Sequence, residues 1–203
     1  MPVFENDGLE VIACMLDARP DFVREIGACL TEDEHRRARD LTWERDRRRF
    51  MVTRGRLRHV LGSRLGIPPS DIELEYGPYG KPRLSRRMPV QGLHFGVSRS
   101  GDLAVIALSD AREVGVDIEE VRPVAEADDI AALCFSVAEQ ESYRALPPED
   151  RPDGFMRRWT RLEAISKALG CGLGDPTAPD DRDWSLHTFI PKVGYIGTVV
   201  VES

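Results

Sequence analysis

The strongest constraint on the fold is a short apolar segment that carries two acids. It reads Val114-Gly115-Val116-Asp117-Ile118-Glu119. Alternate residues of a β-strand share a face, so Asp117 and Glu119 point to one side and their apolar neighbours to the other. Two carboxylates this close repel each other, and burial is costly unless a cation meets them. The segment therefore predicts a strand with a metal-binding polar face, although an exposed strand edge has the same pattern.

A third acid lies on a predicted helix about forty residues later. Trp159, Glu163 and Lys167 are spaced four residues apart, which places them on one helical stripe. A Glu-to-Lys pair at this spacing is also an ordinary stabilising contact of a helix. The functional interpretation makes Glu163 a third metal ligand or a general base, with Lys167 directed at a phosphate. Magnesium suits these donors because it binds carboxylate oxygens and completes its shell with water and substrate phosphate.

The positive charge of the chain is concentrated in one block. Residues 36–64 hold eleven arginines and three acids, within a chain whose net charge is −7. A nucleic-acid-binding protein has a wider basic footprint and a basic overall charge, so nucleic acid is not an expected partner. The block indicates an anion site or a docking face for an acidic partner, or else a solvated amphipathic helix. In particular, a helix around Arg49, Arg54 and Arg58 would suit an acidic protein.

The order of the predicted elements indicates an α+β protein. Helical patterns cover residues 31–65, 127–145 and 153–169, and strand patterns cover residues 71–76, 94–98, 103–108, 114–118, 184–190 and 195–201. Thr31 and Glu34 have the spacing of a capping box, and Gly170 is placed to end a helix. Short turns between residues 94 and 118 predict an antiparallel meander. The repeated order predicts two similar halves that meet near residue 110.

Cysteine usage and hydropathy favour a cytoplasmic protein. The four cysteines are scattered without a Cys-x-x-Cys pair, which is typical of reduced thiols. The N-terminus has no basic region followed by an apolar stretch, so no secretion signal is expected. No run approaches the roughly 18 apolar residues that a membrane span needs. Two turns that carry a cation, around Lys81 and Arg99, are suited either to an anionic ligand or to solvent.

Five of these segments occur in an order that resembles the 4′-phosphopantetheinyl transferases, specifically the larger surfactin-synthetase type. The resemblance runs from about Asp46 to Leu173. Its motifs are Gly80-Lys81-Pro82-Arg83-Leu84, Phe95-Gly96-Val97-Ser98-Arg99-Ser100-Gly101, Gly115-Val116-Asp117-Ile118-Glu119, Phe135-Ser136-Val137-Ala138-Glu139, and the helix from Trp159 to Lys167 with Gly170 and Gly172 after it. The resemblance implies two α/β halves related by pseudo-twofold symmetry, each an antiparallel sheet packed with helices. Residues 1–110 would bind the nucleotide and the carrier, and residues 111–203 would hold the metal site and the catalytic helix.

The resemblance also implies a reaction. A serine hydroxyl on an acyl or peptidyl carrier protein attacks the β-phosphorus of coenzyme A, and 3′,5′-ADP leaves. Asp117, Glu119 and Glu163 match the positions that hold Mg2+, Lys167 would stabilise charge on the phosphate, and Glu163 would take the serine proton. The positions that match the coenzyme A site are Arg49, Lys81, Pro82, Ser98 and Arg99. The expected partners are coenzyme A and a carrier protein of polyketide or nonribosomal peptide synthesis, without a membrane, and the expected state is a monomer.

Two residues depart from the family pattern. Arg99 stands where the family has a histidine, and Leu162 stands where it has a lysine. Arginine still binds phosphate, but it neither accepts a hydrogen bond nor loses its proton. We expect these changes to tune the affinity for coenzyme A. They leave two alternatives open: a catalytically impaired homologue that binds coenzyme A or a carrier, or a different coenzyme A enzyme on the same fold.

Overall fold

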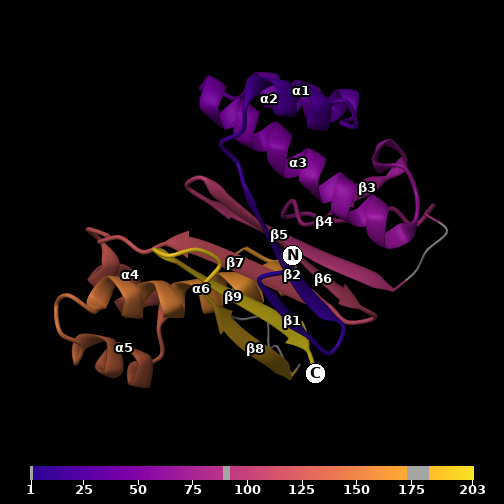
Figure 1. Cartoon of the computed structure of the whole chain (residues 1–203). Helices are drawn as coiled ribbons and strands as arrows, with labels where there is room; N and C mark the ends of the chain where they lie inside the picture. Colours follow the sequence, from indigo (N-terminus) through magenta and orange to yellow (C-terminus); the bar gives the residue numbers. More distant parts are fainter. Residues whose placement is uncertain (1, 89–91, 173–182) are drawn as a thin grey trace.

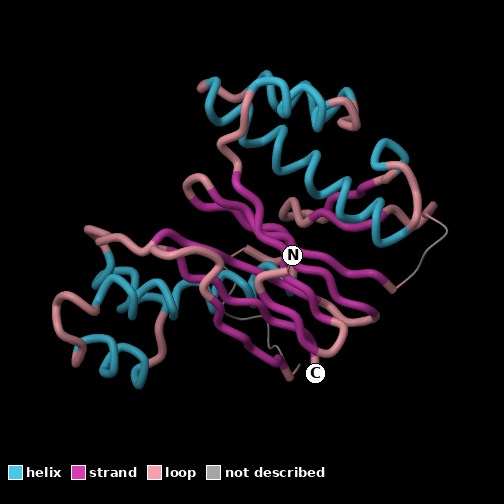
Figure 2. The backbone as a smooth tube through the Cα atoms, viewed as in Figure 1, coloured by secondary structure: helices cyan, strands magenta, loops and turns pink. Residues whose placement is uncertain are grey.

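The computed structural model describes residues 2–88, 92–172 and 183–203, so Leu173, the last residue of the resemblance, lies outside it. The helices of these ranges are α1 (Pro20–Gly27), α2 (Glu32–Asp40), α3 (Glu44–Leu65), α4 (Ala127–Cys134), α5 (Val137–Arg144) and α6 (Arg151–Leu169), with a 3₁₀ turn η1 (Pro69–Asp71). The strands are β1 (Phe4–Asn6), β2 (Leu9–Met15), β3 (Leu74–Tyr76), β4 (Pro82–Leu84), β5 (Leu93–Ser100), β6 (Leu103–Asp110), β7 (Val114–Glu120), β8 (Trp184–Phe189) and β9 (Tyr195–Glu202). Helices pack with antiparallel sheets, so the predicted α+β class is confirmed (Figures 1 and 2).

The first sheet has the strand order β1-β2-β6-β5, and all neighbouring pairs are antiparallel. The inner strand β6 is buried from Leu103 to Ser109 because both of its faces are covered. On one face Leu57 and Leu61 of α3 pack against Ile106 and other apolar side chains of the sheet. Figure 1 shows α3 lying over this sheet, with α1 and α2 beyond it. The packing holds the arginine-rich helix beside β5.

The second sheet has the order β7-β9-β8 and shares a core with the first. That core joins Leu9, Val105, Val116 and Val199 among its buried residues. The other face of the second sheet carries α6, whose Ala164 and Ala168 meet Val200 of β9 in a separate apolar cluster. The two sheets thus pack face to face, with α3 outside one and α6 outside the other.

A glycine allows α6 to come unusually close to β7. A Cβ atom added to Gly115 would lie 2.0 Å from the carbonyl oxygen of Ala164 and 2.5 Å from the backbone nitrogen of Ala168. Real Cβ atoms are not found at such distances, so no other residue fits here without displacing the helix. The close approach brings the acids of β7 next to the side chains of α6.

The predicted meander of three strands is wrong in its last member. β5 and β6 form the expected antiparallel pair, but β7 pairs with β9 instead of β6. The physical reason lies in β9, which is buried from Tyr195 to Val201 and therefore fits between two partners. β7 still runs beside β5, where the hydroxyls of Ser98 and Ser100 accept hydrogen bonds from the backbone N–H groups of Ile118 and Glu120.

The other predicted elements are confirmed with small changes. The helical stretch 31–65 divides into α2 and α3, and Thr31 and Glu34 form the predicted capping box. The stretch 127–145 divides into α4 and α5, because Ser136 starts a new helix with a capping box of its own. Gly170 ends α6 in a left-handed conformation, with φ of 67°. The sequence analysis missed β1, β2, β4 and α1.

The helices found in residues 2–88, 92–172 and 183–203 lack the combination of length and hydropathy that crossing a bilayer requires.

Candidate active site

Asp117 lies buried where β5, β7 and α6 meet. Its side chain is 2% exposed, and its Oδ1 atom accepts hydrogen bonds from Ser98 Oγ at 2.8 Å and from Lys167 Nζ at 2.5 Å. The other oxygen, Oδ2, is buried and has no hydrogen-bond partner among the described residues. A buried carboxylate oxygen without a partner is costly, so it marks a position where a ligand or an ion would be stabilised.

Glu119 and Glu163 lie near Asp117 on two different elements. Glu119, two residues along β7, is half-buried and accepts a hydrogen bond from Ser100 Oγ at 2.7 Å. Glu163 is half-buried on α6, one turn before Lys167. In the part of the chain that the structure describes, no hydrogen bond reaches the Glu163 carboxylate. Its oxygens are therefore available to a substrate.

The three acids and Lys167 line a single cavity of about 380 Å³. Residues of α3, β4, β5, β7 and α6 form its walls: Phe50, Thr53, Arg54, Pro82, Val97, Ser98, Arg99, Asp117, Glu119, Glu163 and Lys167. Seven of the nine site residues predicted from the sequence are in this set. They come from segments far apart in the chain, which the packing of α3 and α6 on the two sheets brings together.

The pKa of each of the three acids is raised, and burial is the largest cause in every case. At Asp117 the ammonium group of Lys167 opposes the rise in pKa. At Glu163 the charges of Asp117 and Glu119 add to the rise in pKa, while Lys167 again lowers it. The acids therefore repel one another electrostatically, and a cation among them would relieve the repulsion.

Residues that fit a hard cation are present, but they do not form a closed metal cage. Across residues 2–88, 92–172 and 183–203, no three acids, histidines or cysteines are grouped closely enough to hold a metal ion. The unpartnered Oδ2 of Asp117 and the oxygen donors of Glu119 and Glu163 match the preference of magnesium. Lys167 supplies the neighbouring positive charge in this arrangement. The metal-binding role of the three acids therefore stays a prediction.

Two of the predicted coenzyme A residues do not line this cavity. Arg49 donates to both carboxylate oxygens of Asp17, at 2.8 and 2.9 Å, and to the carbonyl oxygen of Gly101 at 2.6 Å. Lys81 Nζ donates to Glu113 Oε2 at 2.8 Å and to the carbonyl oxygen of Ala168 at 2.7 Å. Lys81 instead lines a neighbouring cavity of about 410 Å³. Both cations are thus engaged with acceptors of the protein outside the cavity that the three acids line.

The structure accounts for the two departures from the family pattern. Arg99 is exposed on the wall of the cavity, where its guanidinium is accessible to a ligand. Leu162 packs against a cluster that includes Phe135, Tyr143 and Phe155. A lysine at position 162 would direct its charge toward this apolar cluster, so the leucine serves the packing of α4 and α5 on α6.

The expectation that Arg54 and Arg58 form a docking face is wrong. Both are buried, at 8% and 2% exposed, and both form ion pairs with Glu34. Sequence reasoning placed them with the exposed arginines of the block and thereby missed Arg54 as a residue of the cavity wall. The available signal was their i, i+4 spacing, which places both arginines on one stripe of α3, where they can share one acid.

Comparisons with known proteins show the family of this chain. Residues 18–111 match the profile of the 4′-phosphopantetheinyl transferase N-terminal family, and residues 113–193 match that of the 4′-phosphopantetheinyl transferase superfamily. The 4′-phosphopantetheinyl transferase HetI of Nostoc sp. is 34% identical, over 97% of this chain and 88% of HetI. The chain therefore belongs to the 4′-phosphopantetheinyl transferase superfamily.

The matches to two further relatives cover a smaller share of each relative's length. The 4′-phosphopantetheinyl transferase AcpT of Escherichia coli K12 is 40% identical, over 61% of this chain and 58% of AcpT. The human L-aminoadipate-semialdehyde dehydrogenase-phosphopantetheinyl transferase is 31% identical, over 70% of this chain and 48% of its own. The similarity thus extends to proteins of distant organisms.

Proposed function

We propose that this protein transfers the 4′-phosphopantetheine group of coenzyme A to a serine of an acyl or peptidyl carrier protein. The observation that carries the proposal is the gathering of Asp117, Glu119, Glu163 and Lys167 around one cavity, in a chain of this superfamily. Three carboxylates and a lysine supply a base, a cation site and a positive charge. Phosphoryl transfer needs these groups, because its catalysis consists mainly of positioning and charge stabilisation.

The proposed step forms one bond and breaks one. The serine oxygen bonds to the β-phosphorus, the bond between that phosphorus and the bridging oxygen breaks, and 3′,5′-ADP carries the electron pair away. Glu163 takes the serine proton, because its half-buried carboxylate accepts no hydrogen bond from the described residues. Lys167 donates to a phosphate oxygen, and Ser98 keeps Asp117 oriented.

Magnesium belongs to this proposal as the expected cofactor. Asp117, Glu119 and Glu163 would hold it, and it would neutralise charge on the pyrophosphate. The orphaned Oδ2 of Asp117 supports this assignment. Arg49, Lys81, Pro82, Ser98 and Arg99 remain the proposed coenzyme A residues, with Pro82, Ser98 and Arg99 on the cavity wall and Arg49 and Lys81 outside it.

We also propose that the protein is a transferase of the surfactin-synthetase type. Its two similar halves would be residues 1–110 and 111–203. In its support, the two family profiles meet between residues 111 and 113, and the first sheet ends at Asp110. A cytoplasmic monomer acting on carriers of polyketide or nonribosomal peptide synthesis is part of the same proposal.

A carrier-modification assay tests the proposal. The protein is incubated with coenzyme A, magnesium and a panel of apo carrier proteins, and each carrier is weighed by intact mass spectrometry. We expect a phosphopantetheine adduct on at least one carrier, and none when Asp117→Asn replaces the wild type. Binding of coenzyme A without any adduct on the panel would favour the impaired homologue. The absence of both would overturn the proposal.

A further inference from the structure

Strand β5 runs beside β7, although the two strands belong to different sheets. A Cβ atom added to Gly96 of β5 would lie 3.3 Å from Val116 Cγ1 and 3.4 Å from the Val116 backbone nitrogen, so the glycine permits a close approach. Alternate residues of a strand share a face, which directs Ser98 and Ser100 toward β7 as well. The two serines therefore lie opposite the acidic segment of β7.

Ser100 joins the two strands through one hydroxyl group. Its Oγ atom accepts a hydrogen bond from the backbone N–H of Glu120 at 3.2 Å and donates one to Glu119 Oε2 at 2.7 Å. Because a hydroxyl has a single proton, accepting from the backbone leaves that proton for the carboxylate. Ser98 makes the same pair of bonds two residues earlier, with Asp117 and the backbone N–H that follows it. Each serine thus holds one acid of the candidate active site.

The serine bond leaves one oxygen of each acid open. Glu119 Oε1 accepts no hydrogen bond from the residues that the structure describes, and neither does the buried Asp117 Oδ2. Both acids line the cavity of the candidate active site. One oxygen of each acid is therefore held by the fold, while the other is available to a ligand.

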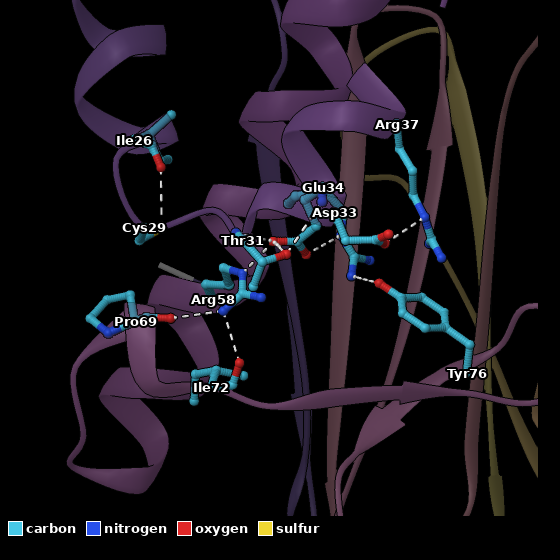
Figure 3. Close-up of polar contacts among 11 residues, drawn as sticks. Ile26, Cys29, Thr31, Asp33, Glu34, Arg37, Arg58, Pro69, Ile72 and Tyr76 are labelled. Atoms are coloured by element: carbon cyan, nitrogen blue, oxygen red, sulfur yellow. Dashed lines mark hydrogen bonds and ion pairs between the residues drawn. The ribbon is translucent and has the colours of Figure 1, made fainter. Parts of the chain in front are cut away.

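A buried acid with a structural role is bonded differently. Glu34 lies outside the cavity, and its two oxygens accept hydrogen bonds from Arg54 Nε at 3.0 Å and from Arg58 Nε at 2.7 Å. Figure 3 shows Arg58 beside Glu34, with further bonds to backbone carbonyl oxygens. Neither oxygen of Glu34 is left open, as expected for a buried carboxylate that serves the fold.

A second serine–glutamate pair provides an internal comparison. Ser85 Oγ donates to Glu75 Oε1 at 2.8 Å and accepts from the backbone N–H of Arg87 at 3.3 Å, which repeats the bonding of Ser100. Here, however, the other oxygen, Glu75 Oε2, lies 3.5 Å from Arg83 Nη2 in an ion pair. Ser85 and Glu75 do not line the cavity of the three acids. The pair has the same chemistry without an open oxygen, so Ser85 is a matched control.

We propose that Ser100 is a positioning residue that holds Glu119 with its open oxygen directed at the cation of the active site. The inference rests on the proposed function for its metal site, and it adds a residue that supports a metal ligand from a neighbouring strand. A glutamate side chain has several rotatable bonds, and ordering it costs free energy. The bond from Ser100 orders the side chain before the cation binds, as hydrogen bonds to metal ligands do in other proteins.

Binding of Mn2+ to the protein saturated with coenzyme A tests the inference without a carrier. Mn2+ is the probe because it prefers the same oxygen donors as magnesium and is counted directly by electron paramagnetic resonance. In Ser100→Ala we expect the dissociation constant of Mn2+ to rise about tenfold, because the bond that orders Glu119 is lost. Ser85→Ala should bind Mn2+ as the wild type does. Ser100→Thr, which keeps the hydroxyl, should restore the affinity.

Glu119→Ala shows whether Ser100 acts through Glu119. This variant should bind Mn2+ more weakly than Ser100→Ala, and combining the two should add no further loss, because the serine contributes only through the glutamate. Melting temperatures separate positioning from folding. Ser100→Ala and Ser85→Ala should melt within a few degrees of each other, since each loses the same two hydrogen bonds, yet differ in their affinity for Mn2+.

Three outcomes in the variants would overturn the inference: wild-type affinity for Mn2+ in Ser100→Ala, an equal loss in Ser85→Ala, or additive losses in the double variant. A wild type that binds no Mn2+ beyond what coenzyme A binds alone would overturn it as well. A wild type that binds Mn2+ but modifies no carrier would remove the proposed transfer reaction and leave this inference intact.

Discussion

Lys81 and Ala168 are joined by a hydrogen bond from the Nζ atom of the lysine to the carbonyl oxygen of the alanine, at 2.7 Å. The same ammonium group pairs with Glu113 at 2.8 Å. Ala168 lies in the last turn of α6, whose carbonyl groups have no partners within the helix. A lysine expected to bind a nucleotide therefore caps the helix that carries Glu163 and Lys167.

Removing this cap should destabilise the protein. We expect Lys81→Met to lower the free energy of unfolding in urea by about 2 kcal/mol, because a charged donor with two strong acceptors is lost. Lys192→Met is the matched control, since Lys192 is more exposed than Lys81 and its pair with Asp102 should contribute less than about 1 kcal/mol. Unchanged stability in Lys81→Met, combined with weaker coenzyme A binding, would instead favour the nucleotide-binding role.

The contact between β7 and α6 leaves no room for a methyl group. We expect Gly115→Ala to lower the free energy of unfolding by about 3 kcal/mol, because its Cβ would lie 2.0 Å from the carbonyl oxygen of Ala164. Gly172→Ala makes the same chemical change where the nearest atom, on Tyr79, is 3.7 Å away, and it should be close to neutral. Equal midpoints of urea unfolding in the two variants would contradict the described packing.

Asp117 should be essential for turnover and dispensable for the fold. We expect Asp117→Asn and Asp117→Ala to reduce kcat by about two to three orders of magnitude, as other losses of preorganised charge do. The circular dichroism spectrum should stay that of the wild type. Near-normal turnover in either variant would show that the reacting groups lie elsewhere.

Arg99 should affect the binding of coenzyme A more than the chemical step. Its side chain is exposed on the cavity wall, whereas Asp117 is buried. We expect Arg99→Ala to raise KM for coenzyme A about tenfold with little change in kcat, because uniform binding is lost. A fall in kcat alone would contradict this assignment, and Arg99→His tests whether the family residue restores KM.

The free energy of unfolding should fall at acid pH because Glu34 becomes protonated. Burial raises the pKa of Glu34, but the hydrogen bonds from Arg58 and Thr31 and the charge of Arg54 outweigh it, so this pKa lies below its ordinary value of 4.5. A lowered pKa in the folded state stabilises the protein above pH 4.5, and the gain is lost as pH falls through the folded-state pKa. The free energy of unfolding of wild type minus that of Glu34→Gln should therefore shrink below pH 4.5. A constant difference from pH 7 to pH 3 would argue against the buried pair.

The sequence was sufficient to predict the features that depend on local periodicity. Alternation placed Asp117 and Glu119 on one face, helical spacing aligned Glu163 with Lys167, and the Thr31 capping box marked a helix start. The pairing of β7 with β9 was not predictable in this way, because strands about 80 residues apart are joined only by the shared core.

The sequence also did not show which acceptors each arginine and lysine contacts. Eleven arginines between residues 36 and 64 look alike in sequence, yet Arg58 is buried against backbone carbonyls while Arg36 and Arg39 remain exposed. Lys81 contacts Glu113 and Ala168 because the packed fold brings these distant residues together. Such contacts depend on tertiary distances, which spacing along the chain does not encode.

The residues of the cavity wall come from both parts of the chain, and this has a consequence for how the activity is inherited. Arg54, Ser98 and Arg99 precede residue 111, whereas Asp117, Glu163 and Lys167 follow it. A chain severed between them would leave the three acids and Lys167 on one fragment, and the arginines and serine of the cavity wall on the other. Neither fragment alone would retain a complete set, so the reaction requires both pieces to be kept and passed on together.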